Sequence, residues 1–148
     1  MPRSQSLCLF PDINVWLAAS AAAHIHHSIA SRWFDSLLPE ARVCFCRVTQ
    51  MGLLRLLTSE SVMGPEVLTQ AEAWKAYDEF LEDDHIEFAP EPAELEIEFR
   101  RHSSRPHPTS KTWTDDYLAA FAASGDLTLV TFDQAFRGRV RNLKLLSI

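Results

Sequence analysis

The sequence lacks any apolar run that approaches the roughly 20 residues of a membrane-spanning helix. The first six residues lead straight into a short apolar stretch without the small-residue cleavage site of a secretory signal. No internal repeat and no low-complexity segment is present. These absences exclude a membrane-spanning protein, and we expect a cytoplasmic location.

Cysteine is also scarce. The chain has three, Cys8, Cys44 and Cys46, and none of them forms a C-x-x-C pair. All three fall in strand-like apolar runs, which is where buried cysteines commonly lie. We therefore expect buried free thiols in a reducing cytoplasm rather than a disulfide framework or a zinc site.

Length and composition suit one compact domain covering residues 1–148, because 47% of the residues are hydrophobic and can supply a core. The net charge of −6 hides an uneven distribution. Residues 78–98 contain ten of the twenty acids and no Lys or Arg, so the remainder has fourteen basic residues against ten acids. Such local charge matters more for steering a polyanion than the total does.

The basic residues form two stretches in the last third of the chain. Alone, each would be interpreted as solvated surface. Their position beside two candidate site aspartates favours a path for a polyanion. The first stretch holds Arg100, Arg101, Arg105 and Lys111, and the second holds Arg137, Arg139, Arg141 and Lys144.

Short β-rich runs alternate with amphipathic segments along the chain. This alternation predicts an α/β fold with three layers, in which helices cover both faces of a central parallel sheet of four to five strands. The expected strands cover residues 7–10, 43–48, 86–88, 127–131 and 143–146. The expected helices cover residues 14–22, 28–38, 50–57, 69–81, 94–101 and 112–123.

Local signals mark several of these boundaries. Thr49 is a candidate cap for the helix that follows it. Thr69 and Glu72 have the spacing of a capping box. Gly125 is expected to end the last helix, and residues 59–68, which contain Gly64 and Pro65, are expected to form a connecting loop.

Polar side chains from four segments should meet at one edge of this sheet. Asp12 and Asp133 follow the first and fourth strands, at the carboxyl edge where ligands of open α/β sheets bind. Gln50 and Asp115 lie in the first turns of helices that run back from the same edge. Clustered carboxylates repel each other unless a cation lies among them. We therefore predict a divalent metal site and phosphodiester chemistry.

Each of these residues also has a simpler interpretation. A single Asp at a strand end is often a turn or cap residue, and Asp115 could serve only the first turn of its helix. Asp116 is a rival of Asp115 for the site. His24, His26 and His27 resemble a zinc cluster, but their spacing suits neither a helical pair nor a finger, so we expect packing at a helix entry.

Four segments of the sequence, in this order, resemble the PIN-domain nucleases and, more narrowly, the VapC-type toxins of bacterial toxin–antitoxin pairs. Together with the intervening helices they span nearly the whole chain. The resemblance implies a PIN-like fold and a metal-dependent endoribonuclease that acts on structured RNA (tRNA or rRNA), is neutralised by a cognate antitoxin and forms a homodimer. The segments are FPDINVWLAA (10–19), CRVTQMGLLRLLT (46–58), WTDDYLAAFA (113–122) and LVTFDQAF (129–136).

By position, the resemblance makes Asp12, Asp115 and Asp133 the catalytic, metal-binding acids. Asn14 and Thr131 match residues that support the site. Mg²⁺ is the expected ion, with Mn²⁺ as a substitute, because it prefers oxygen ligands.

One position departs from the family pattern. Gln50 stands where most PIN nucleases have a glutamate, which removes a charge but keeps an oxygen acceptor. Fewer negative ligands favour one firmly held Mg²⁺ over two.

Basic residues near the matching segments are candidates for RNA contacts: Arg47, Arg55, Lys111 and Arg137. An apolar face near Leu53, Leu54 and Trp74 is expected to serve dimer or antitoxin contacts.

Two other functions remain open from the sequence. A catalytically silent PIN-like module that binds RNA or protein is favoured only by Gln50. A phosphoaspartyl receiver or phosphatase-like domain would need an adjacent acid pair or D-x-D after the first strand, but Asp12 is followed by Ile13 and Asn14.

Overall fold

A computed structural model describes residues 7–147 of the chain. Residues 1–6, on which the expected absence of a signal sequence partly rests, lie outside the described residues. Five parallel strands form one sheet in the order β3-β2-β1-β4-β5, as the alternation of strands and helices predicts. The strands are β1 (Cys8–Pro11), β2 (Arg42–Phe45), β3 (Ile86–Phe88), β4 (Thr128–Thr131) and β5 (Leu143–Leu145).

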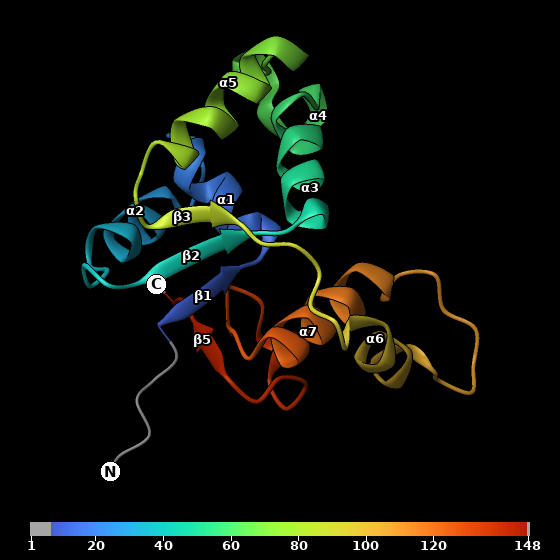
Figure 1. The fold of residues 1–148 in the computed structure, drawn as a ribbon. Coiled ribbons are helices and arrows are strands. Elements are labelled where there is room, and N and C mark those ends of the chain that lie inside the picture. The colour runs from blue at the N-terminus through green and yellow to red at the C-terminus, as the bar shows by residue number, and fades with distance from the viewer. Residues whose placement is uncertain (1–6, 148) are drawn as a thin grey trace.

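Helices cover both faces of this sheet (Figure 1). One face carries α1 (Ile13–Ser20), α2 (His27–Asp35), α3 (Arg47–Leu57) and α5 (Gln70–Leu81), and the other carries α6 (Leu95–Ser103) and α7 (Trp113–Gly125). The short helices are α4 (Glu60–Met63), η1 (Gly64–Glu66) and η2 (Gln134–Phe136). Within residues 7–147, no helix combines the length and apolar character that crossing a bilayer requires.

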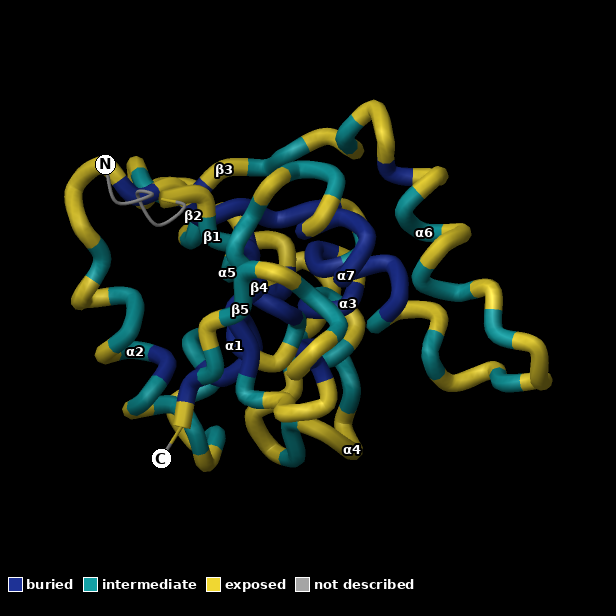
Figure 2. Tube along the Cα trace, turned by 90° about the horizontal axis from the view of Figure 1, so that it is seen from below, coloured by how far each residue is buried: buried dark blue, intermediate teal, exposed yellow. Residues whose placement is uncertain are grey.

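The two-residue period of the strands builds a core on each face of the sheet. In β2, Val43 and Phe45 pack with Trp16 under α1, whereas Cys44 faces the core of Phe10 and Phe121 under α7. The Trp16 and Phe45 rings stack with centroids 3.7 Å apart. The buried residues run through the middle of the molecule, along the strands, α1 and α7 (Figure 2).

Four local predictions need correction. Residues 47 and 48 begin α3 instead of extending β2. Thr49 is the third residue of α3 and Cys46 is its cap; the Thr49 hydroxyl accepts a hydrogen bond from the Cys46 backbone N–H (2.9 Å). The connection 59–68 contains α4 and η1. Asp126, not Gly125, adopts the left-handed conformation (φ 52°) that ends α7.

Other local predictions are confirmed, and two are partly wrong. Thr69 and Glu72 form the reciprocal hydrogen bonds of a capping box at the start of α5. Cys44 and Cys46 are buried, but the Cys8 side chain is exposed. Leu53 is fully buried and so cannot form part of an exposed apolar face, whereas Trp74 is 47% exposed.

Candidate active site at the carboxyl edge of the sheet

The strand order reverses between β1 and β4, and both strands end in an aspartate-bearing segment. In Figure 1 the arrows of β1, β2 and β3 point toward the side of the molecule where α3 begins. This edge is where open parallel sheets bind their ligands. The first residues of α1, α3 and η2 therefore all lie at the same edge.

Asp12 is the most enclosed of the three predicted acids, with 7% of its surface exposed. It caps α1, and its Oδ1 accepts a hydrogen bond from the Asn14 backbone N–H at 2.7 Å. Its Oδ2 accepts a hydrogen bond from the Thr131 hydroxyl at 2.5 Å. Burial raises the pKa of Asp12 above its ordinary value, although both hydrogen bonds oppose the shift.

Thr131 connects Asp12 to Asp133. Its buried hydroxyl donates to Asp12 and accepts a hydrogen bond from the Asp133 backbone N–H at 3.0 Å. The Asp133 carboxylate in turn caps η2 by accepting a hydrogen bond from the Ala135 N–H at 2.8 Å. One hydroxyl at the end of β4 thus holds the acid after β1 and the backbone of the acid after β4.

Asp115 completes the group from the first turn of α7. Burial raises the pKa of Asp115, the nearby charge of Arg139 lowers it, and the charges of Asp133 and Asp116 raise it further. Asp115 and Asp133 also raise the pKa of Asp12. These mutual effects show that the structure brings the three carboxylates within electrostatic reach of one another.

The donor set at this edge fits a hard divalent cation, because carboxylate oxygens are the ligands that Mg²⁺ prefers. Within residues 7–147, no three His, Cys, Asp or Glu side chains are as closely grouped as the ligands of one metal ion. The three carboxylates therefore lie near one another, but their oxygens are not arranged around a single ion position. Asp133 is exposed and Asp115 is half-buried, so neither is as enclosed as Asp12.

Asp116, the rival of Asp115, is occupied elsewhere. Its side chain is 1% exposed and pairs with Arg105 and Arg139. Burial alone raises the pKa of Asp116, but hydrogen bonds from Arg105 and Thr112 and the positive charges of both arginines outweigh burial and lower it. α7 therefore turns Asp116 inward and leaves Asp115 half-buried, within electrostatic reach of Asp133.

Gln50 is buried in the first turn of α3. Its Oε1 accepts a hydrogen bond from Arg47 at 2.6 Å, and a hydrogen bond from Gln50 lowers the pKa of Tyr77 against the larger effect of burial, which raises it. The Arg47 guanidinium also lies 4.6 Å from the centre of the Phe88 ring. Among the described residues, the Gln50 side chain therefore contacts Arg47 and Tyr77 and makes no hydrogen bond to Asp12, Asp115 or Asp133.

The other predicted residues differ in how near they lie to this edge. The Asn14 side chain makes no hydrogen bond among residues 7–147, and only its backbone N–H supports Asp12. Arg47, Lys111 and Arg137 are exposed and flank the first turns of α3 and α7 and the end of η2. Arg55 lies in the last turn of α3, eight residues or about 12 Å from its start.

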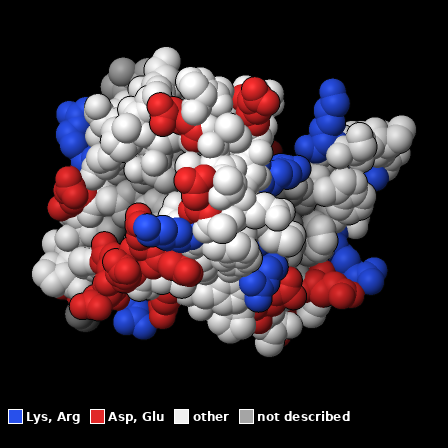
Figure 3. Space-filling model, turned by 90° about the horizontal axis from the view of Figure 1, so that it is seen from above, with Lys and Arg blue, Asp and Glu red and all other residues white. Residues whose placement is uncertain are grey.

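Sequence reasoning missed the roles of Arg105 and Arg139 as partners of Asp116. Both were visible only as members of basic stretches. The face seen in Figure 3 shows a large group of acidic side chains on the left and smaller acidic groups elsewhere, and several Lys and Arg lie toward the side where α6 and the segment before α7 project in Figure 1.

The three histidines pack as expected at the entry of α2. The His27 Nδ1 lies 2.7 Å from the Ala18 carbonyl oxygen. The His26 ring stacks on Phe132 with centroids 4.6 Å apart. These contacts use the rings as structural groups.

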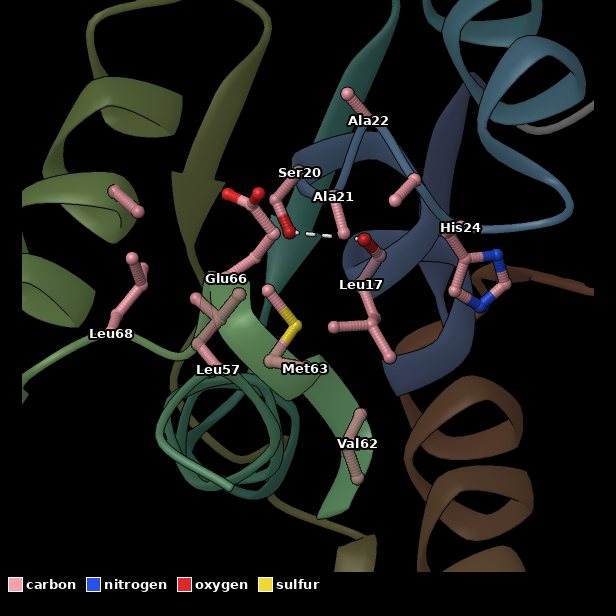
Figure 4. Close-up of a pocket in the computed structure, with 12 residues that line it drawn as sticks. Leu17, Ser20, Ala21, Ala22, His24, Leu57, Val62, Met63, Glu66 and Leu68 are labelled. Carbon is pink, nitrogen blue, oxygen red and sulfur yellow. Dashed lines mark hydrogen bonds between the residues drawn. The ribbon is translucent and has the colours of Figure 1, made fainter. Parts of the chain in front are cut away.

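A cavity of about 440 Å³ lies away from the aspartates, between the end of α1, α3, α4 and α5. Figure 4 shows Leu17, Leu57 and Met63 at this cavity, with His24 and the Glu66 carboxylate also lining it. The lining is mostly apolar and contains none of the predicted site residues. It is therefore a separate feature from the carboxyl edge.

Residues 9–141 match the PIN domain. The chain belongs to the PIN-domain family. It is 46% identical over 132 residues to ribonuclease VapC41 of Mycobacterium tuberculosis, an alignment that covers 86% of this chain and 90% of that protein. The residues that match the PIN domain, 9–141, include all four of the segments that carry the predicted site.

Solved structures share the PIN fold at low sequence identity. The VapBC2 structure of Rickettsia felis, bound to a promoter DNA fragment, includes a chain with a TM-score of 0.69 and 13% identity, covering 95% of this chain and 99% of its own. The structure of VapC20 of Mycobacterium tuberculosis, a toxin that cleaves the sarcin–ricin loop, has a TM-score of 0.67 and 17% sequence identity. The match covers 94% of this chain and 99% of VapC20. These likenesses support the PIN-like α/β/α architecture.

Proposed function

We propose that this chain is a VapC-type toxin, a metal-dependent endoribonuclease that hydrolyses phosphodiester bonds in structured cellular RNA such as tRNA or rRNA. The observation that supports it most is that Asp12, Asp115 and Asp133 of a PIN-family chain come from three segments at the β1–β4 switch point and influence one another electrostatically. The 46% identity to a ribonuclease over most of the chain supports the same reaction. The gathered carboxylates have no evident role in a module that only binds.

In this proposal Asp12, Asp115 and Asp133 hold Mg²⁺, for which Mn²⁺ can substitute. When bound, such an ion polarises the scissile phosphate and lowers the pKa of a water molecule. Thr131 keeps the Asp12 carboxylate oriented toward the site and fixes the Asp133 backbone. Supporting hydrogen bonds of this kind commonly orient metal ligands.

The RNA backbone needs cationic partners beside the carboxylates. Arg47, Lys111 and Arg137 lie at or near the carboxyl edge and are proposed to contact phosphates, whereas Arg55 is too far along α3 to take part at the scissile bond. Arg47 is the best positioned of them, because Gln50 and the Phe88 ring hold its guanidinium. A guanidinium fixed in this way loses less freedom when it binds a phosphate.

A cognate antitoxin and a second copy of the chain are the proposed protein partners, in the cytoplasm. The structural neighbour from Rickettsia felis is a toxin–antitoxin complex. The apolar cavity of Figure 4 is large enough to accept apolar side chains of an antitoxin peptide. The exposed Met51 and Trp74 belong to a second apolar area, between α3 and α5, that is available to a second copy.

The decisive experiment compares the wild-type protein with Asp12→Asn. The substitution keeps the size and the cap to Asn14 but removes a charged oxygen ligand. We expect the wild type to cut a structured RNA with Mg²⁺ or Mn²⁺ and to stop when a chelator is added, and we expect Asp12→Asn to lose cleavage while its circular dichroism is unchanged.

A folded Asp12→Asn protein that retains full cleavage would reject the site. Asp35→Asn, an exposed acid in the last residue of α2, provides the matched control and should cleave RNA like the wild type.

A further inference from the structure

Three charged side chains beside Asp115 form what we call the Asp116 cluster: Arg105, Asp116 and Arg139. Arg105 donates two hydrogen bonds to the Asp116 carboxylate, at 2.7 and 2.9 Å, and a third to the Thr112 hydroxyl at 3.1 Å. Arg139, in the segment between η2 and β5, donates a hydrogen bond to Asp116 Oδ1. The Asp116 side chain is 1% exposed, and the arginine side chains are 28% and 24% exposed.

The cluster joins two connections to the first turn of α7. Arg105 belongs to the segment between α6 and α7, and Arg139 belongs to the segment between η2 and β5. Both segments lie outside helices and strands, so the ion pairs with the buried Asp116 carboxylate are the main interactions that hold the two arginine side chains in place. Bidentate pairing gives a guanidinium a defined plane as well as a defined place.

The cluster has an unbalanced charge. Two guanidinium groups share one carboxylate, and among residues 7–147 neither arginine pairs with another acid. The cluster therefore has a net charge of +1 in partly buried surroundings. Of its members, Arg139 lies close enough to Asp115 for its charge to oppose the rise that burial causes in the pKa of Asp115.

Arg139 is the member with donors to spare. Only one of its hydrogen bonds is made within the described residues, to Asp116, and its guanidinium lies 5.7 Å from the centre of the Phe136 ring. An arginine has five N–H donors. The remaining donors belong to a side chain that is held by Asp116 and lies near Asp115, and they have no acceptor among residues 7–147.

We propose that Arg139 binds a backbone phosphate of the substrate RNA next to Asp115, and that Asp116 is the positioning residue that holds Arg139 there. The inference rests on the proposed function, because its ligand is the RNA strand that the aspartates cut. A phosphate is the fitting ligand, since a guanidinium fork matches its oxygens and the excess charge of the cluster is positive. Arg105 keeps Asp116 ionised and in place.

The first experiment measures binding of a fluorescently labelled RNA stem-loop by anisotropy, in chelator so that no cleavage occurs, over a series of salt concentrations. Arg139→Gln should weaken binding roughly tenfold and reduce the slope of log affinity against log salt by about one. The protein should remain folded, because Arg105 still pairs with Asp116.

Arg141→Gln is the matched control. It removes the same charge two residues away on the same segment, where the exposed Arg141 makes no ion pair within residues 7–147. We expect a change of about twofold or less, as for a distant surface charge. Equal losses in the two variants would overturn the inference and leave the proposed function standing. A wild type that binds no RNA would overturn both.

The second experiment separates positioning from charge. Asp116→Asn makes the protein one charge more positive, so a purely electrostatic role predicts tighter RNA binding. If Asp116 positions Arg139, the same variant should bind RNA several-fold more weakly. Tighter binding by a folded Asp116→Asn protein would overturn the positioning role, and Arg139→Gln tests the phosphate contact independently if that variant does not fold.

Discussion

At the scale of single residues, Thr131 links two of the proposed metal-binding aspartates through its one hydroxyl. Its hydroxyl is fully buried, donates to the Asp12 carboxylate and accepts from the Asp133 N–H. Both partners belong to the proposed metal site but come from opposite ends of the chain. A buried hydroxyl used in both directions cannot be replaced by an apolar group without leaving polar atoms unpaired.

Thr131→Val should therefore harm both stability and metal binding. The valine has the same shape but leaves the Asp133 N–H without its acceptor, which should cost about 1–3 kcal/mol in the free energy of unfolding. Loss of the hydrogen bond to Asp12 should weaken divalent-ion binding roughly tenfold or more. Urea denaturation and calorimetric titration with Mn²⁺ measure the two effects.

The control is Thr128→Val on the same strand, whose side chain makes no hydrogen bond among residues 7–147. Thr128→Val should change neither quantity appreciably. Equal metal affinity in Thr131→Val and the wild type would show that the hydroxyl does not orient the ligand.

Cys44 gives a residue-scale prediction for the core. Burial raises the pKa of Cys44 from 9.0 to about 12. The folded protein therefore holds this proton more tightly than the unfolded chain, and the resulting stability is lost as pH rises between about 9 and about 12. At mildly alkaline pH the native protein should react with a thiol reagent at the exposed Cys8 but not at Cys44.

Mass spectrometry of the labelled protein, with and without denaturant, measures this difference. Rapid labelling of Cys44 in the native protein would mean that the sheet opens readily beneath α7.

At the scale of elements, the first turn of α3 shows how one helix is fitted to the site. Gly52 faces Ile13, the residue after Asp12, so closely that an added Cβ would lie 2.4 Å from the Ile13 Cδ1 atom. This close approach brings α3 against the start of α1. Gln50 and Arg47 are thereby placed at the edge where β1 and β2 end.

Gln50→Glu should tighten divalent-ion binding, because it restores a fourth carboxylate at this edge. The gain should be limited, since Arg47 already donates to the side chain at position 50 and would form an ion pair with the new carboxylate. Removing that competitor in the double variant Arg47→Gln with Gln50→Glu should tighten binding further. Calorimetric titration of the two variants and of Arg47→Gln alone separates these contributions.

An unchanged affinity in both Gln50→Glu proteins would show that position 50 lies outside the ligand set. A gain that is the same with and without Arg47 would show that the guanidinium does not compete for the carboxylate.

At the scale of the whole molecule, an acidic protein is proposed to bind a polyanion. The total charge is −6, yet half of the acids lie within residues 78–98, from the last turns of α5 to α6. The basic residues proposed to lie at the carboxyl edge, Arg47, Lys111 and Arg137, all fall outside that segment. Short-range screening in salt makes this local arrangement decisive.

Lys111→Gln and Arg55→Gln test this arrangement with equal changes in charge. Lys111 lies two residues before α7 at the proposed site, and Arg55 lies in the last turn of α3. In chelator, Lys111→Gln should weaken RNA binding and reduce the salt slope by about one, as for a lost phosphate contact. Arg55→Gln should change little, and a reversed order would place the RNA along α3 instead.

Much of the fold follows from patterns that are local in sequence. The two-residue alternation of β2 places Val43 and Cys44 on opposite faces, and the spacing of Thr69 and Glu72 marks the start of α5. The prediction at Thr49 was wrong because a hydroxyl three residues inside a helix can serve the cap as well as one at its start. Sequence spacing does not distinguish the two cases.

The sequence by itself determined the order of strands and helices and, with it, the edge at which Asp12 and Asp133 emerge. Hydrophobic periodicity and strand ends are properties of neighbouring residues, and a parallel sheet must bring its carboxyl ends together. Only the tertiary structure distinguished the surroundings of Asp115 from those of Asp116. That difference depends on Arg105, from the segment before α7, and Arg139, from the segment before β5, which pair with Asp116 in the interior and leave Asp115 half-buried near Asp133.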